Sequence, residues 1–108
     1  MKTQIDICAN NLLNYQEKFK ALSDEYRLYI LNILSKNGET CVCDLSELLE
    51  LSQSRLSYHL KILLDADFIS VEKEGKWNYY SANPKEIKEI LSEDLYFKLY
   101  PIDKIIFI

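Results

Sequence analysis

Two cysteines separated by a single residue, Cys41 and Cys43, form the clearest chemical pattern in the chain. Thiolates are ligands of soft metal ions and metalloids, and the pair stands at the start of a predicted helix, where the helix dipole lowers a thiol pKa. This spacing is awkward for a disulfide, which needs particular Cα and Cβ separations. The pattern therefore favours two ligands of one ion, the alternative being two small buried apolar side chains.

A second pattern follows in a helix predicted to begin at Ser52. Its leucines recur on one side, and the rest of its surface carries side chains suited to bases and phosphates: Gln53, Ser54, Arg55, Ser57, Tyr58 and Lys61. Arginine can fork onto guanine, glutamine can pair with adenine, and hydroxyls or lysine suit phosphates. His59, the only histidine, is interpreted as a DNA contact or as a packed, hydrogen-bonded side chain. The face favours DNA recognition over an ordinary solvated helix surface.

The elements around these patterns are mainly helical. Apolar periodicity and capping residues predict four helices in the first two thirds of the chain: residues 11–21, residues 24–37 behind a Ser23 cap, residues 42–50, and the helix behind Ser52. The Asn37-Gly38 pair is a stop signal for the second of them. A last helix is predicted to begin at Pro84 and to end at Pro101.

A β-hairpin is predicted between the fourth and last helices. Runs of β-branched and aromatic residues at 68–71 and 77–80 surround a polar loop that contains a glycine. Lys73 and Lys76 in this loop region can reach phosphates or the minor groove, the alternative being an ordinary soluble loop tip. The order of four helices, two strands and a helix predicts a mainly α fold with a small β-hairpin wing, a winged helix-turn-helix.

Composition narrows the class of protein. The 108 residues are 48% hydrophobic and 28% charged, which fits one ordered domain over residues 1–108. No apolar run approaches the roughly 18–20 residues of a membrane span, and the N-terminus lacks a signal-peptide pattern. A soluble cytoplasmic protein with no membrane partner is expected. The net charge of −4 counts weakly against nucleic-acid binding, but residues 52–80 carry equal numbers of acidic and basic side chains.

An enzyme is not expected. Neither Gly38 nor Gly75 has a second glycine nearby, so a phosphate-binding loop is excluded. A nucleophilic pair of a cysteine with His59 would need a pocket that a chain of this size scarcely provides.

Residues 19–83 resemble the ArsR/SmtB family of metal-sensing bacterial and archaeal repressors. The family's opening helix pair is similar to FKALSDEYRLYILNIL, its helix-turn-helix to CVCDLSELLELSQSRLSYHLKILLDADFIS, and its wing to VEKEGKWNYYSAN. The resemblance implies a homodimer that binds double-stranded operator DNA, an imperfect palindrome, without a cofactor and leaves it when a metal or metalloid binds. Two positions depart from the pattern, because Glu50 stands where glycine is usual and Tyr58 where histidine is common.

The resemblance also implies where the inducer binds. CVCDL matches the sensor box of the arsenic- and cadmium-type members, with Cys41 and Cys43 at its ligand positions for an As(III)-, Sb(III)-, Cd-, Pb- or Zn-type ion. Some arsenic sensors have a third cysteine where this chain has Ser46. Some cadmium and lead sensors add an N-terminal cysteine, so Cys8 is expected to be the third ligand, from either subunit; the alternative is an incidental thiol in a frayed end. The family's other site needs histidine on the last helix, which has none.

Apolar stripes that so small a core cannot bury predict the dimer interface. They run over residues 12–22, which follow a predicted N-terminal arm (1–11), and over residues 87–95. The second stripe belongs to a predicted C-terminal dimerisation helix and tail (84–108), in which Ile105, Ile106 and Phe107 extend the interface. Two other functions stay open: a thiol-redox or metal-independent winged-helix regulator, and a protein-interaction module that does not bind DNA.

Overall fold

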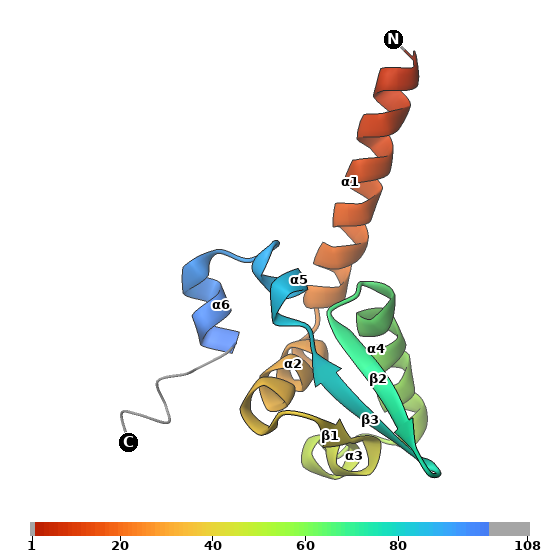
Figure 1. Ribbon diagram of the computed structural model, residues 1–108, viewed down its shortest axis with the longest axis vertical. Helices are drawn as coiled ribbons and strands as arrows, with labels where there is room; N and C mark the ends of the chain where they lie inside the picture. Colours follow the sequence, from red (N-terminus) through yellow and green to blue (C-terminus); the bar gives the residue numbers. More distant parts are fainter. Residues whose placement is uncertain (1, 100–108) are drawn as a thin grey trace.

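The computed structural model describes the backbone of residues 2–99 and the side chains of residues 12–98. The elements follow one another in the order α1 (Lys2–Leu22), α2 (Glu25–Asn37), β1 (Thr40–Cys41), α3 (Val42–Leu49), α4 (Gln53–Asp65), β2 (Ile69–Glu74), β3 (Trp77–Ala82), α5 (Pro84–Lys88) and α6 (Glu93–Leu99). Helix α1 extends away from the body, and the hairpin tip lies at the opposite end of the molecule, where α4 begins (Figure 1). Residues 2–11, expected as an arm, belong to α1.

The boundary between α1 and α2 differs from the prediction by one residue. Asp24, and not Ser23, is the N-cap of α2, because its carboxylate accepts from the backbone N–H groups of Tyr26 and Arg27. The Ser23 hydroxyl instead donates to the Lys20 carbonyl at the end of α1. A carboxylate is also the better partner for the positive end of a helix dipole.

The sheet has one more strand than the sequence predicted. The hairpin strands β2 and β3 pair from Ile69↔Ala82 to Glu74↔Trp77, and β1 joins the other edge of β3 through Thr40↔Tyr80 and Cys41↔Tyr79. The strand order is therefore β1-β3-β2. Two residues are too short for an alternating pattern, so β1 left no signal in the sequence. Its pairing attaches Cys41 to the middle of the wing strand β3.

The C-terminal segment forms two short helices instead of the predicted single one. Helix α5 ends at Lys88, and α6 begins at Glu93. The Ser92 hydroxyl accepts from the backbone N–H of Leu95, so it caps a new helix at the point where the old one stops. The predicted end at Pro101 and the tail residues Ile105, Ile106 and Phe107 lie outside the described residues.

The core lies between α2, α4, the hairpin base and α5. Its most deeply buried large side chains are no more than 2% exposed: Ile30, Leu31, Leu34, Leu45, Leu56, Leu60, Leu63, Phe68, Ile69 and Ile87. Ile87 was predicted to contribute to a dimer interface, but it is a core residue, because α5 turns back onto the body. The leucines of α4 face inward as predicted, which leaves the other side of that helix outward.

No helix within the described range is long and apolar enough to cross a membrane.

Candidate nucleic-acid interface and cysteine pair

Helix α4 presents a polar, exposed surface that begins at its first turn. The hydroxyl of its N-cap, Ser52, accepts from the backbone N–H of Arg55 at 3.3 Å, and Leu56, Leu60 and Leu63 are buried on the inner side. Six of the seven α4 residues predicted to meet DNA are exposed: Gln53, Ser54, Arg55, Ser57, Tyr58 and Lys61. The α4 surface is the name used below for these six residues.

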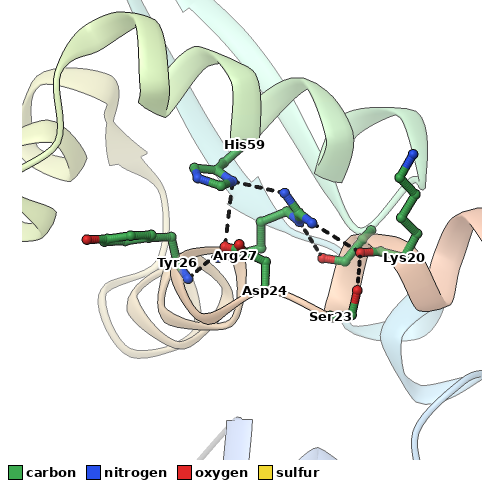
Figure 2. A network of polar contacts seen from close by, with 7 residues as sticks. Lys20, Ser23, Asp24, Tyr26, Arg27 and His59 are labelled. Atoms are coloured by element: carbon green, nitrogen blue, oxygen red, sulfur yellow. Dashed lines mark hydrogen bonds and ion pairs between the residues drawn. The ribbon is translucent and has the colours of Figure 1, made fainter.

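His59 is the exception. Its side chain is only 8% exposed, and its Nδ1 lies 2.9 Å from Nη1 of Arg27 and 3.7 Å from Oδ2 of Asp24 (Figure 2). The rings of Tyr26 and Tyr58 lie 5.7 Å and 5.3 Å from the imidazole, centroid to centroid. Of the two roles predicted for this histidine, the structure shows the packed and hydrogen-bonded one, and the burial of the side chain does not favour a DNA contact.

A hollow of about 400 Å³ lies beside the start of α4, and it is lined by Asp24, Tyr26, Ser54, Arg55, Tyr58 and His59. Within it, the Arg55 guanidinium lies over the Tyr26 ring, with Cζ 5.4 Å from the ring centroid. Stacking on an aromatic ring restricts the rotamers of an arginine without neutralising it. Tyr26 is a residue of α2, so no local pattern in the sequence indicates its position beside the α4 surface.

The hairpin tip supplies two further cations. Lys73 and Lys76 are both exposed, and Gly75 between them has a φ of 65°, a value that favours glycine in a tight turn. The Lys76 ammonium lies 5.5 Å from the centroid of the Trp77 ring. On α4 itself, Lys61 is paired with Asp65 at 3.1 Å, so its charge is partly neutralised. On the surface made by α4 and the hairpin tip, the cations of Arg55, Lys73 and Lys76 therefore have no ion pair with a described side chain.

The two cysteines lie at the junction of β1 and α3 and differ in exposure. Cys41 is buried at 6% exposure, ends β1, and serves as the N-cap of α3, its Sγ accepting from the Cys43 N–H at 3.3 Å. Cys43 is exposed in the first turn of the helix. The hydrogen bond with the Cys41 side chain, partial burial and the neighbouring Asp44 carboxylate raise the pKa of the Cys43 thiol. A backbone hydrogen bond at Asp44, in the first turn of α3, lowers this pKa as expected of a helix terminus, but the causes that raise the pKa are larger.

A complete metal site is not present among the described side chains. No group of three or more His, Cys, Asp or Glu side chains that can hold a metal ion occurs there. Ser46, at the position of the family's third cysteine, uses its hydroxyl to donate to the Leu51 carbonyl at 2.7 Å, which holds the turn between α3 and α4. Cys8 lies within α1, but its side chain lies outside the described residues. The described side chains therefore offer two thiols as metal ligands, those of Cys41 and Cys43, which suit part of the ligand set of a soft ion.

Comparisons with known proteins agree with this arrangement. The family model described as "Bacterial regulatory protein, arsR family" matches residues 24–71. Over 84 residues the chain is 55% identical to an arsenical resistance operon repressor of Bacillus subtilis (strain 168), covering 78% of this chain and 80% of that protein. Over 88 residues it is 36% identical to a cadmium resistance transcriptional regulatory protein, a CadC homolog, of Staphylococcus aureus. That match covers 82% of this chain and 73% of the Staphylococcus aureus protein.

A solved structure confirms the fold. It is the homodimeric winged helix-turn-helix DNA-binding domain of a possible ArsR-family transcriptional regulator from Mycobacterium bovis. The match has a TM-score of 0.68 at 23% sequence identity, and it covers 93% of this chain and 84% of that one. The predicted winged helix-turn-helix is therefore correct.

Proposed function

This chain belongs to the arsR family of bacterial regulatory proteins, and on that premise we propose that it represses transcription by binding operator DNA as a homodimer and is released when a thiophilic metalloid or metal ion binds Cys41 and Cys43. As a family member it is a transcriptional regulator and not an enzyme. The relative from Bacillus subtilis is an arsenical resistance operon repressor, which favours arsenite or antimonite as the inducer.

The observation that carries the DNA-binding half of the proposal is the composition of the α4 surface. It combines an arginine, a glutamine, two serines and a tyrosine around the N-terminal turns of a helix whose opposite side is fixed in the core. A helix held in this way can enter the major groove with its first turns against the base edges. The exposed Lys73 and Lys76 then suit phosphates beside the groove, where they position the protein without reading sequence.

The proposed dimerisation is supported by the exposed side of α1. Leu12, Leu13, Tyr15 and Phe19 are 49–67% exposed, although all four are large and apolar. Three of them, Leu12, Tyr15 and Phe19, lie along one stripe at helical spacing. A stripe of this kind on a helix that extends from the body suits a second copy of the same helix. Leu95 and Phe97 of α6, at 48% and 44% exposure, are candidates for the same interface.

The inducer half is supported by the donor chemistry and by its location. Two thiolates suit a soft ion, and As(III) takes about three, so we propose Cys8 of either subunit as the third ligand. Bound there, the ion would supply strong bonds to sulfur that replace thiol protons.

Cys41 connects the proposed inducer site to the rest of the structure. It ends β1, opposite Tyr79, and its sulfur caps α3. Any displacement of this residue therefore acts on the first turn of α3 and on the wing strand β3 together. Helix α3 leads into α4 through the turn that Ser46 holds. Release requires a loss of about 2–4 kcal/mol of DNA affinity, at or slightly above a typical allosteric coupling.

The test is a gel-shift titration with a duplex that the wild-type protein has selected from a random pool. We expect binding without added metal and release by arsenite, Cd²⁺ or Pb²⁺. A shift that ignores these ions and responds to oxidant would point to a thiol-redox regulator. Failure to select any duplex would point to a protein-interaction module.

The ligand set is tested with single Cys→Ser variants, titrated with arsenite and Cd²⁺ by thiolate absorbance. We expect Cys41→Ser and Cys43→Ser to lose both ion binding and DNA release, and Cys8→Ser to weaken both. If Cys8→Ser keeps wild-type affinity and release, the site contains two cysteines and Cys8 is not a ligand.

A further inference from the structure

Arg27 is a buried arginine that contacts two other helices. It is 6% exposed, and its guanidinium makes three hydrogen bonds. Nε donates to the Ala21 carbonyl at 2.8 Å and Nη2 donates to the Lys20 carbonyl at 3.2 Å, both in the last turn of α1. Nη1 lies 2.9 Å from Nδ1 of His59, in the middle of α4. Figure 2 shows the side chain between the end of α1 and the imidazole.

The third of these bonds determines the protonation state of the histidine. A guanidinium has donors only and does not lose its proton in proteins, so Nδ1 must be the acceptor. The imidazole is then neutral, with its hydrogen on Nε2. Helix α1 ends in carbonyl groups that lack partners within the helix, and Arg27 donates to two of them while it contacts α4. The Lys20 carbonyl also accepts from the backbone N–H and the hydroxyl of Ser23. One side chain thus connects the end of α1 to the helix that carries the α4 surface.

The charged groups around His59 act in different directions. Burial is the main cause that lowers the pKa of His59, the nearby Asp24 carboxylate raises it, and the guanidinium groups of Arg27 and Arg55 lower it. The remaining neighbours are the rings of Tyr26 and Tyr58. The pKa of His59 is lowered on balance, which favours the neutral imidazole that the hydrogen bond from Arg27 requires.

We infer that Arg27 is a positioning residue for DNA recognition, which ties the recognition helix α4 to the end of α1 through His59 only while that histidine is neutral. This inference rests on the proposed function, because it concerns the helix that is proposed to read DNA. Helix α1 also carries the exposed apolar stripe, so the same connection relates the proposed dimer helix to the recognition helix.

Protonation of His59 removes the connection for two reasons. Protonated Nδ1 has no lone pair to accept from Arg27, and the two cations would then be about 2.9 Å apart. The nearest alternative partner is Oδ2 of Asp24 at 3.7 Å, an oxygen that already accepts from the backbone N–H groups of Tyr26 and Arg27. A shift of the ring toward this oxygen moves α4 relative to α2 and disturbs the cap of α2.

The DNA affinity of this protein is expected to fall on acidification, which is opposite to the change that a more positive net charge would cause. Acidification makes a protein more positive, which by itself strengthens attraction to phosphates. A loss of DNA affinity between about pH 8 and pH 5.5 therefore reports the broken connection and not the general charge. Carboxylates titrate mainly below this window, and the cysteine thiols mainly above it.

The experiment uses the full chain and its single histidine, which gives one unambiguous set of imidazole signals in ¹⁵N NMR. DNA affinity is measured in parallel by fluorescence anisotropy, with a labelled duplex selected at about pH 8 from a random pool. His59→Asn is the matched variant, because its amide oxygen lies near the position of Nδ1, can accept from Arg27 and does not titrate. His59→Leu removes the acceptor, and circular dichroism checks the folding of each variant.

For the wild type we expect an unprotonated Nδ1 at about pH 8 and weaker DNA binding at pH 5.5, by less than about tenfold because the pKa of His59 lies below its ordinary value. His59→Asn should bind within about threefold of the wild type at pH 8 and show no such loss in acid. His59→Leu should bind weakly at both pH values.

Several results would overturn the inference. A protonated Nδ1 at pH 8 would contradict the hydrogen bond itself, whatever the DNA result. Equal pH profiles for the wild type and His59→Asn would contradict the positioning role. A third outcome is an unprotonated Nδ1 at pH 8 in a wild type that selects no duplex. The connection between the helices would then exist, but the proposed function would fail, and with it the role of Arg27 in DNA recognition.

Discussion

The ammonium group of Lys18 lies 2.7 Å from the carbonyl oxygen of Ala66, the C-cap residue of α4, in a buried environment 48 residues away along the chain. The same Nζ is 3.5 Å from Oε1 of Glu86 and 5.0 Å from the centroid of the Phe68 ring. A cation at the negative end of a helix dipole satisfies both the free carbonyl and the dipole. Lys18 therefore holds the C-terminal end of the recognition helix against α1, while Arg27 holds its middle.

Replacing Lys18 with methionine tests this contact. Lys18→Met keeps much of the side-chain volume but leaves the Ala66 carbonyl without its donor, so we expect the free energy of unfolding to fall by about 1–3 kcal/mol. Urea denaturation followed by circular dichroism measures the change. Lys20→Met, on the exposed side of the same helix, is the control, and an equal effect of the two substitutions would contradict a specific role for Lys18.

Arg55 and Tyr26 should act together in DNA recognition. Arg55→Ala is expected to cost about 1–3 kcal/mol of binding to the selected duplex if Arg55 reads a base, whereas Lys76→Ala should weaken all duplexes about equally. Tyr26→Leu should cost about 0.5–1 kcal/mol, because it removes the ring beneath the guanidinium. Anisotropy titrations of the two single variants and the double variant give the coupling. Strictly additive losses would show that Tyr26 does not orient Arg55.

Replacing Glu50 with glycine should stabilise the protein. It occupies the left-handed region, with φ 54° and ψ 45°, at the C-cap of α3, where a side chain is strained. We expect Glu50→Gly to raise the free energy of unfolding by about 0.5–1 kcal/mol, since relief of strain outweighs the added freedom of the unfolded chain. Chemical denaturation measures it. Glu50→Ala keeps the strain and is the control; if alanine stabilises as much as glycine, the removed carboxylate is responsible instead.

Charge on the exposed stripe of α1 should prevent dimerisation. The double variant Leu12→Glu, Phe19→Glu places two carboxylates on the proposed interface, and we expect it to sediment as a monomer at micromolar concentration where the wild type is a dimer. Leu48→Glu alters an equally exposed leucine on α3 and should stay dimeric. A wild-type monomer that still binds the selected duplex would refute the dimer.

Ser46→Cys should complete a local set of three thiols. Position 46 lies three residues after Cys43 on α3, so the two side chains are neighbours on the helix surface. We expect at least about tenfold tighter arsenite binding, together with a loss of about 0.5–1.5 kcal/mol of stability from the broken bond to the Leu51 carbonyl. Leu48→Cys adds a thiol on another side of the helix. Equal gains from both variants would indicate nonspecific thiol binding.

Much of this protein follows from local sequence. The helix stripe of Leu56, Leu60 and Leu63 and the hairpin around Gly75 have strong periodic or turn signals, and these signals depend only on neighbours in the chain. The same holds for the exposure of the α4 surface, because a buried stripe requires that the opposite side face outward. The cysteine pair and the family resemblance were likewise readable without coordinates.

Contacts between residues distant in sequence were not readable, since nothing in a local pattern specifies its partner. The strand β1 exists only because Thr40 and Cys41 meet β3, and Tyr26 lies beside Arg55 only because α2 packs against α4. His59 shows the difference most clearly. Its position beside Arg55 and Tyr58 in the sequence suggested a DNA contact. The orientation of α4 that buries its leucines also turns the imidazole inward. There Arg27, which is distant in sequence, supplies the hydrogen-bond partner that a buried nitrogen requires.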